Sequence, residues 1–278
     1  MDKVNILGVK VDMVNIPEAA DKIMEFLDED RLHTVFTPNS EIIMAAYRDN
    51  EFADILNAAD LLTADGIGVV YASKILKKPI KERAAGYDIA CKLLEKLDGS
   101  EHKLYLFGGK PGVAEKAMAN LLKKYKNLKI AGLRNGYFKK EEESDIVKDI
   151  NESGADIIFV CLGAPLQEKW ISRHKDELNV RVAMGIGGSL DVFAGTAERA
   201  PDVFCKLGLE WFYRLCKEPK RAVRMMDLPK FGITVLTKGK KYFVRVRTFS
   251  AEAHTVRPCN QLADTGILYT SCIVLSLR

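Results

Sequence analysis

The stretch ADIIFVCLGAPLQEKWISRHKDELNVRVAMGIGG, residues 155–188, decides the fold. Its first nine residues form a continuous apolar run, which is typical of a strand buried on both faces. QEKWISRHKDEL then follows a helical pattern, and VRVAMGIGG is another apolar strand. Continuous apolar strands that alternate with helices predict a parallel sheet covered by helices on both faces.

The preceding part of the chain repeats this rhythm. Strand candidates occur at NILGVKVDM, HTVFT, ADLLTAD, KLYLFGG and LKIAGLRNGYF, and helical patterns separate most of them. Pro17 suits the first turn of one helix, and Ser40 is the expected N-cap of another. We therefore predict an α/β fold with a Rossmann-like, mostly parallel sheet in residues 1–195.

The composition describes a globular protein of the cytoplasm. The chain has 278 residues, of which 47% are hydrophobic. No uncharged apolar stretch of about 18 residues predicts a transmembrane helix, and the N-terminus lacks the pattern of a secretory signal. The six cysteines show no CxxC pair, so we expect reduced core thiols.

The C-terminal part differs from the rest in charge. Residues 203–247 hold 12 Lys and Arg against 3 Asp and Glu, a local charge of +9. We define residues 196–247 as a basic helical appendage, interrupted at Pro219 and Pro229, and expect residues 248–278 to be a flexible or non-native tail. Such a segment predicts an anionic partner: a membrane surface, a nucleic acid or a phosphorylated substrate.

The appendage has the pattern of an interfacial helix. Its cations recur at spacings of three and four, beside an apolar set that begins with Trp211 and Phe212; the cations are Arg214, Lys217, Arg221 and Arg224. This pattern favours an amphipathic helix on anionic lipid. One alternative is an ordinary surface helix, and another is a nucleic-acid-binding module. No RNP-like or DNA-reading motif supports the latter, so we expect no nucleic-acid partner.

Glycine-bearing or proline-bearing turns follow five of the strand candidates. They are TPNSE (37–41), TADGIG (63–68), FGGKPG (107–112), LGAPLQEKW (162–170) and GIGGSLD (185–191). In an open parallel sheet these turns share the carboxyl edge, where ligands bind. FGGKPG suits a nucleotide diphosphate, with Gly109 for close approach and Lys110 for charge. It matches neither a Walker loop nor a dinucleotide fingerprint, so we predict no cofactor.

The acidic residues and histidines indicate no metal site. The one Asp-x-Asp match, residues 28–30, lies at a polar helix end and is more simply a solvated face. The four histidines are scattered along the chain. We therefore expect a site without a catalytic metal.

Six segments in a fixed order resemble one glycosyltransferase family. They are TPNSEIIMAA, LLTADGIGVV, ERAAGYD, LYLFGGKPG, GAPLQEKW and IGGSLDVFAGTAERAP. Together they are similar to the WecG/TagA/CpsF family, glycosyltransferase family 26, over about residues 1–235. The resemblance implies transfer of a sugar from a UDP-sugar to a polyprenyl-diphosphate-linked acceptor, by an enzyme peripheral to the inner face of the plasma membrane.

The resemblance is strongest to the branch that makes the linkage unit of wall teichoic acid. It implies UDP-N-acetylmannosamine as donor, undecaprenyl-diphosphate-GlcNAc as acceptor and a β-1,4 product, formed with inversion and without metal. The alternative is another UDP-sugar transferase of the family in polysaccharide synthesis, because the donor sugar cannot be deduced from these residues.

The resemblance also implies roles for single residues. Asp65 matches the family's acid at a strand end and is the expected general base, with a helix cap as the alternative. Thr37 and Asn39 are placed in the pocket by analogy, Thr37 as a catalytic residue, and Arg83 can pair with a phosphate. Further expected substrate contacts are Gln167 for a sugar group and Asp191 for uracil or ribose.

Closure of the appendage over the site is a further implication. An arginine would then hold the leaving diphosphate where other enzymes use a metal, and the candidates are Arg214, Arg221 and Arg224. An exposed amphipathic appendage also invites self-association, so a homo-oligomer is a possible state.

Overall fold

A computed structural model describes residues 1–206, 208–217 and 226–252. Residues Met1–Phe243 make up one compact unit, and the following paragraphs concern that unit. Within the described ranges, no helix combines the length and the apolarity that a membrane crossing requires.

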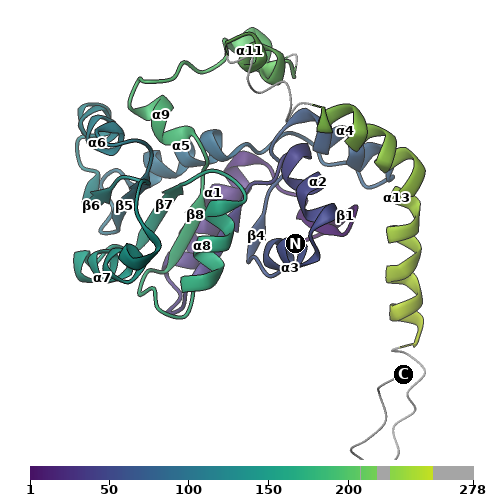
Figure 1. Cartoon of the computed structure of the whole chain (residues 1–278), viewed down its shortest axis with the longest axis horizontal. Coiled ribbons are helices and arrows are strands. Elements are labelled where there is room, and N and C mark those ends of the chain that lie inside the picture. The colour runs from purple at the N-terminus through teal and green to yellow at the C-terminus, as the bar shows by residue number, and fades with distance from the viewer. Residues whose placement is uncertain (207, 218–225, 253–278) are drawn as a thin grey trace, which may run out of the picture. The chain divides into compact units, whose positions relative to one another are not determined.

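The predicted parallel sheet is confirmed. Six strands pair in the order β4-β3-β8-β7-β5-β6, and each neighbouring pair is parallel. β7 and β8, from the stretch that opened the sequence, lie side by side in the centre (Figure 1). The strands span β3 His33–Phe36, β4 Leu61–Leu62, β5 Lys103–Gly108, β6 Lys129–Arg134, β7 Ile157–Cys161 and β8 Val182–Gly185.

Helices cover both faces of this sheet, as predicted. Successive strand residues alternate between two buried clusters; Phe159 belongs to one cluster and Val160 to the other. One cluster includes residues of α1 Ile16–Leu27, α5 Gly86–Leu97, α6 Val113–Lys124 and α9 Ser189–Phe193. The other includes α2 Ser40–Arg48, α3 Asn50–Asn57, α4 Ile67–Ile75, α7 Glu143–Ser153 and α8 Leu166–His174. A short 3-10 turn, η1 Lys140–Glu142, precedes α7.

An N-terminal hairpin is attached to the edge strand β4. β1 Lys3–Ile6 and β2 Val9–Asp12 pair antiparallel around Leu7 and Gly8, both at positive φ. The buried carboxylate of Asp12 accepts a hydrogen bond from the Leu62 N–H at 2.9 Å. This contact satisfies a backbone donor of an edge strand and blocks further strand addition there.

Two local predictions were wrong. The N-cap of α2 is Asn39 rather than Ser40, because the Asn39 side chain accepts from the Ile42 N–H at 3.0 Å. Pro229 does not interrupt a helix. It lies in the first turn of α13, Asp227–Glu252, where a missing N–H leaves no intrahelical bond unmade.

The appendage contains three described helices. α10 Asp202–Lys206 and α11 Glu210–Lys217 precede α13, and Pro219 lies outside the described residues. Of the predicted tail, residues 248–252 belong to α13, and 253–278 are outside the described residues.

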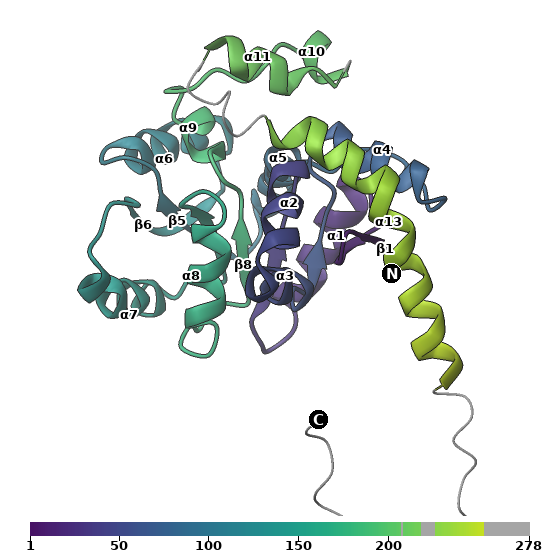
Figure 2. The ribbon, with the colours of Figure 1, turned by 45° about the vertical axis from the view of Figure 1, so that its right-hand side comes forward.

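The first turns of α13 pack against the core. Phe231 and Val235 are buried in the same cluster as α2 and α4. Arg48, in α2, donates two hydrogen bonds to the Asp227 carboxylate, at 2.6 and 2.9 Å. Gly239 lies so close to α4 that an added Cβ would approach Leu76 to 2.8 Å. α13 therefore runs beside α4, as Figure 2 shows, and contributes to the core on that face of the sheet.

Replacing Phe231 by Ala should destabilise the protein, because its side chain is 3% exposed and its removal leaves a cavity. We expect a loss of about 3 kcal/mol in the free energy of unfolding, measured with chemical denaturant. Ile233→Ala on the same helix is the matched control. Its side chain is 62% exposed, and the expected loss is below about 0.5 kcal/mol. Equal losses would contradict the packing described.

Candidate functional site

The five predicted turns lie at one edge of the sheet. Each follows a strand of the parallel sheet, so all five leave from its carboxyl ends. The chain after β3 enters α2 on one face, whereas the chain after its neighbour β8 enters α9 on the other. Such divergence opens a crevice between neighbouring strands, which is where ligands bind in open α/β sheets.

Asp65 follows β4 and is half-buried at this edge. The N-cap residue of α4 is Gly66, so Asp65 is the residue before the N-cap. Gly66 has φ +99°, which permits the sharp turn after Asp65. Gly68 allows α4 to approach α2, because an added Cβ would lie 2.3 Å from the Ser40 Oγ.

Thr37 and Asn39 lie next to the Asp65 turn. The Asp65 N–H donates to the Pro38 carbonyl at 3.1 Å, which joins the two turns. Thr37 is buried against the start of α5, where a Cβ on Gly86 would lie 2.8 Å from the Thr37 Oγ1. Asn39 is half-buried, and its side-chain oxygen caps α2.

Arg83 lies among carboxylates at the same edge. Its Nη2 donates to Asp88 at 2.9 Å, and its Nη1 contacts the Glu210 carboxylate from α11. Burial acts to lower the pKa of Arg83, and the charges of Asp65, Glu210 and Asp88 outweigh it, so that the pKa is raised. The guanidinium therefore stays charged and links Asp65 electrostatically to α5 and α11.

Asp88 and Arg199 complete this ionic cluster and were not predicted from the sequence. The second oxygen of Asp88 accepts from Arg199, whose guanidinium lies 4.7 Å from the centre of the Tyr87 ring. Tyr87 in turn stacks on Phe193 at 5.1 Å. Both charged residues occur within the quoted segments ERAAGYD and IGGSLDVFAGTAERAP, but a contact across 111 residues has no local sequence signal.

Gln167 is buried beneath the turn that follows β8. Its side-chain oxygen accepts from the Gly187 N–H at 3.0 Å, and its nitrogen donates to Glu168 at 2.9 Å. The pKa of Glu168 is raised, because its burial outweighs the hydrogen bond from Gln167, which acts to lower it. With both ends of its amide engaged by the protein, Gln167 shapes the turn that leads to Asp191.

Gly109, Lys110 and Asp191 line neighbouring parts of the edge. The Gly109 N–H donates to the Cys161 carbonyl at 3.2 Å, so this backbone group is used within the protein. Lys110 is exposed, whereas Asp191 is half-buried in α9 and accepts from the Thr196 hydroxyl at 3.3 Å. The N-cap of α9 is Gly188, so Asp191 does not cap that helix.

The predicted cations of the appendage are only partly described. Arg214 lies in α11, whereas Arg221 and Arg224 are outside the described residues. Among the residues that the structure covers, no three His, Cys, Asp or Glu side chains are grouped as metal ligands. The absence of a catalytic metal stays a prediction.

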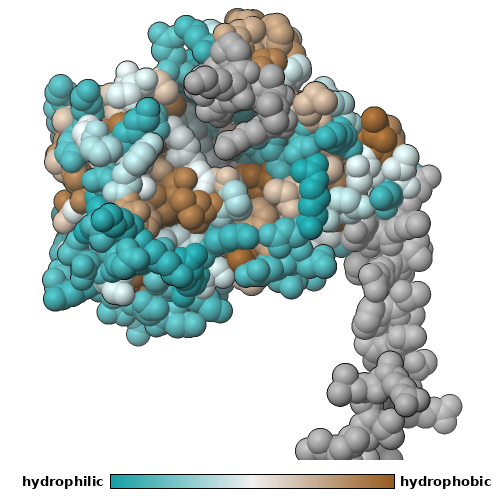
Figure 3. All heavy atoms as spheres, viewed as in Figure 1, coloured by the Kyte–Doolittle hydropathy of each residue, from teal (hydrophilic) through white to brown (hydrophobic). Residues whose placement is uncertain are grey.

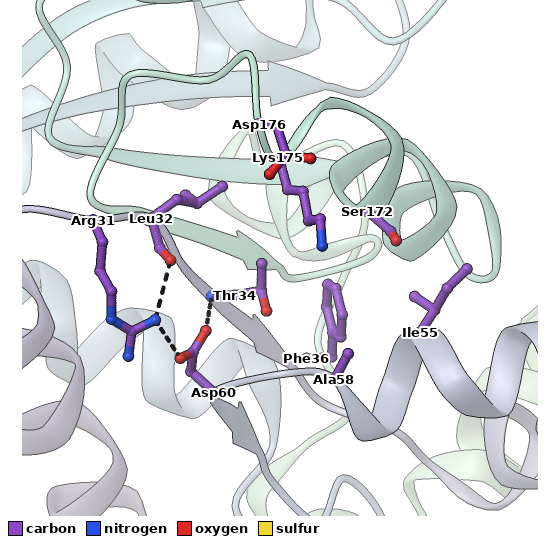
Figure 4. A pocket seen from close by; sticks show the side chains of 10 residues that line it. All are labelled: Arg31, Leu32, Thr34, Phe36, Ile55, Ala58, Asp60, Ser172, Lys175 and Asp176. Carbon is purple, nitrogen blue, oxygen red and sulfur yellow. Dashed lines mark hydrogen bonds and ion pairs between the residues drawn. The ribbon is translucent and has the colours of Figure 1, made fainter. Parts of the chain in front are cut away.

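A cavity of about 400 Å³ lies at the opposite, amino edge of the sheet (Figure 4). Its lining residues come from β3 and the residues before it, from the end of α3 and the residues that lead to β4, and from the end of α8, and include Ser172 and Lys175. Arg31 at its rim is already paired with Asp60 at 2.8 Å, and Asp60 accepts from the Thr34 N–H. The cavity is therefore separate from the predicted site residues, which gather at the carboxyl edge.

Comparisons with known proteins agree with the order of the segments. Residues 4–243 match the glycosyl transferase WecG/TagA/CpsF family. The N-acetylglucosaminyldiphosphoundecaprenol N-acetyl-beta-D-mannosaminyltransferase of Bacillus subtilis (strain 168) is 36% identical over 239 residues, which cover 82% of this chain and 93% of that protein. The protein of the same name from Staphylococcus aureus (strain MRSA252) is 37% identical over 241 residues, 86% and 94% of the two chains.

Gly185→Ala should disturb the turn after β8. An added Cβ would lie 2.8 Å from the Gln167 amide nitrogen, and that buried side chain is held by Gly187 and Glu168. We expect a loss of about 1–3 kcal/mol in the free energy of unfolding. Gly188→Ala is the control, because open space surrounds that position and its φ is −79°. A loss as large for Gly188→Ala would contradict this account of the turn.

Proposed function

Because the chain belongs to the WecG/TagA/CpsF glycosyltransferase family, we propose that it transfers N-acetylmannosamine from UDP-N-acetylmannosamine to undecaprenyl-diphosphate-GlcNAc. The product would carry a β-1,4 linkage, as part of the linkage unit of wall teichoic acid. The names of the relatives support both the transferred sugar and the lipid-linked acceptor. The observation that carries the proposal is Asp65, which lies half-buried at the carboxyl edge of the sheet, where its charge interacts with that of Arg83.

The proposed reaction is a direct displacement with inversion. The acceptor hydroxyl oxygen attacks the anomeric carbon of the donor as the bond to the diphosphate breaks, and UDP leaves. Asp65 takes the hydroxyl proton. A carboxylate acts as a base only when ionised, and a neighbouring guanidinium such as Arg83 favours that state. Thr37, joined to the Asp65 turn through Pro38, would contact the sugar.

The donor would lie along the turns after β5 and β8. Lys110 is exposed and supplies positive charge for the diphosphate, and Asp191 would accept from the uracil or the ribose. Gly109 would permit close approach, and Asn39 would face the sugar. Arg83 donates to two carboxylates, so we assign the leaving diphosphate to Lys110 and to the appendage cations Arg214, Arg221 and Arg224. These cations would supply the charge stabilisation that other transferases obtain from a metal.

We place the enzyme at the cytoplasmic face of an anionic membrane, bound through the appendage. Large apolar side chains in and between α10 and α11 are exposed, and Figure 3 shows hydrophobic atoms at the surface where α11 lies; the side chains are Val203, Leu209, Trp211 and Phe212. Exposed aromatic rings next to cations are typical of interfacial helices, and the lipid-linked acceptor resides in the same bilayer.

The experiment that tests this function is UDP release from UDP-N-acetylmannosamine, with and without a short-chain prenyl-diphosphate-GlcNAc acceptor. We expect acceptor-dependent release that persists in chelator, and slower release from other UDP-sugars. Preference for another donor would place the chain in a different branch of the family. Activity that is lost in chelator and restored by magnesium or manganese would contradict the metal-independent mechanism.

Asp65→Asn should abolish turnover, because the isosteric amide cannot accept the hydroxyl proton. We expect a loss of at least about 100-fold in kcat, the usual contribution of general-base catalysis, with an unchanged melting temperature. Asp54→Asn on the exposed surface of α3 is the control and should leave kcat unaltered. Near-normal turnover by Asp65→Asn would remove Asp65 from the mechanism.

Replacing Trp211 and Phe212 together by Gln should weaken binding to vesicles that contain anionic lipid, because both rings are exposed on α11. The expected loss in vesicle affinity is about tenfold or more, measured by flotation. Tyr137→Gln removes an exposed ring distant in sequence and should have no effect. Unchanged flotation of the double variant would contradict membrane binding through α11.

A further inference from the structure

Glu210 is more buried than the two aromatic residues that follow it in α11. It lies in the first turn of α11 and is 18% exposed, whereas the next two residues, Trp211 and Phe212, are 39% and 45% exposed. An ordinary surface helix has the reverse arrangement, with its apolar side against the core. Apolar packing of these two rings therefore does not hold α11 in place.

Two contacts between this segment and the core lie next to Asp65. The Glu210 carboxylate pairs with the Arg83 guanidinium, and both side chains are largely buried. Gly208, at φ +71°, lies against Ile67, the first residue of α4, so that an added Cβ would approach its side chain to 2.9 Å. A further ion pair of α11, between Lys217 and Glu198, stays within the appendage.

Arg83 is a rigid partner for Glu210. Its other terminal nitrogen donates to Asp88, and Asp88 is held from its far side by Arg199. The planar guanidinium presents donors in a fixed fork, so a carboxylate that pairs with it is fixed in direction as well as in distance. The Asp88 contact thus fixes the Arg83 donors at a defined place beside Asp65.

We propose that Glu210 is a positioning residue, whose ion pair with Arg83 holds α11 over the catalytic edge. The inference rests on the proposed function, and it names the contact that keeps the appendage closed. Glu210 takes no part in the chemistry. It keeps α11 beside the place where the leaving diphosphate develops charge. Arg83 is accordingly the partner of Glu210 in the core, rather than a ligand of the phosphates.

Hydrogen exchange of the full chain tests the role of the Glu210–Arg83 ion pair without reference to activity. The variants are Glu210→Gln, Arg83→Gln and the two combined, and Glu198→Gln is the control, which removes the exposed pair with Lys217. Each single variant of the pair should accelerate exchange of the α11 amides by about tenfold, and the combination should be no faster, because the two side chains act as one unit. Glu198→Gln should leave α11 exchange within about twofold of the parent.

Kinetics separates positioning from a structural role. Glu210→Gln and Arg83→Gln should lower kcat to a similar extent while the KM for UDP-N-acetylmannosamine changes by less than about threefold, because the transition state loses the appendage and the ground state does not. The melting temperature of both variants should equal that of the parent.

Three results would contradict the positioning role of the Glu210–Arg83 ion pair. Loss of activity in Arg83→Gln alone, with Glu210→Gln active, would mean that Arg83 acts on Asp65 or on the phosphates and not through Glu210. Faster α11 exchange in saturating UDP would mean that the diphosphate displaces Glu210. Unchanged α11 exchange in Glu210→Gln would mean that other contacts hold the helix. Failure of the proposed function is distinguishable, because the parent would then release no UDP while the exchange results still stand.

Discussion

The all-parallel sheet is the constraint on which the rest of the structure depends. Parallel strands cannot be joined by tight turns, so each strand is followed by a crossover, and the turns that begin the crossovers meet at one edge. This brings Thr37, Asp65 and Asp191 to the same end of the molecule, although 154 residues separate the first from the last. The core beneath them is apolar on both sheet faces, which leaves this edge as the place for polar chemistry.

The charges at that edge explain how a transferase could dispense with a metal. Asp65, Asp88 and Glu210 surround Arg83, and Arg199 closes the cluster from the other side of Asp88. These carboxylates outnumber the guanidinium groups, so the cluster by itself does not attract a diphosphate. In the proposed mechanism, additional positive charge comes from Lys110 and from the appendage. Closure of the basic appendage would then supply the cations that this cluster lacks.

The sequence predicted the fold more completely than the site. Continuous apolar strands at 157–161 and 182–185 indicated the parallel sheet, because burial on both faces leaves a pattern in a single segment. Asp65 could be selected because it ends a strand ahead of two glycines and matches the acid of the family that the segments resemble. Glu210 could not, because its partner Arg83 is 127 residues away and nothing local marks the pairing. The predicted role of Pro229 failed for a different reason: a proline breaks a helix interior but is tolerated in a first turn.

We infer that ligand binds at the carboxyl edge, although the structure also has a cavity at the amino edge. Hydrogen exchange with and without saturating UDP distinguishes the two places. We expect slower exchange in the turns at 37–41, 63–68, 107–112 and 185–191, with the segments around Arg31 and Lys175 unchanged. Protection confined to the amino-edge cavity, with those turns unaffected, would contradict it.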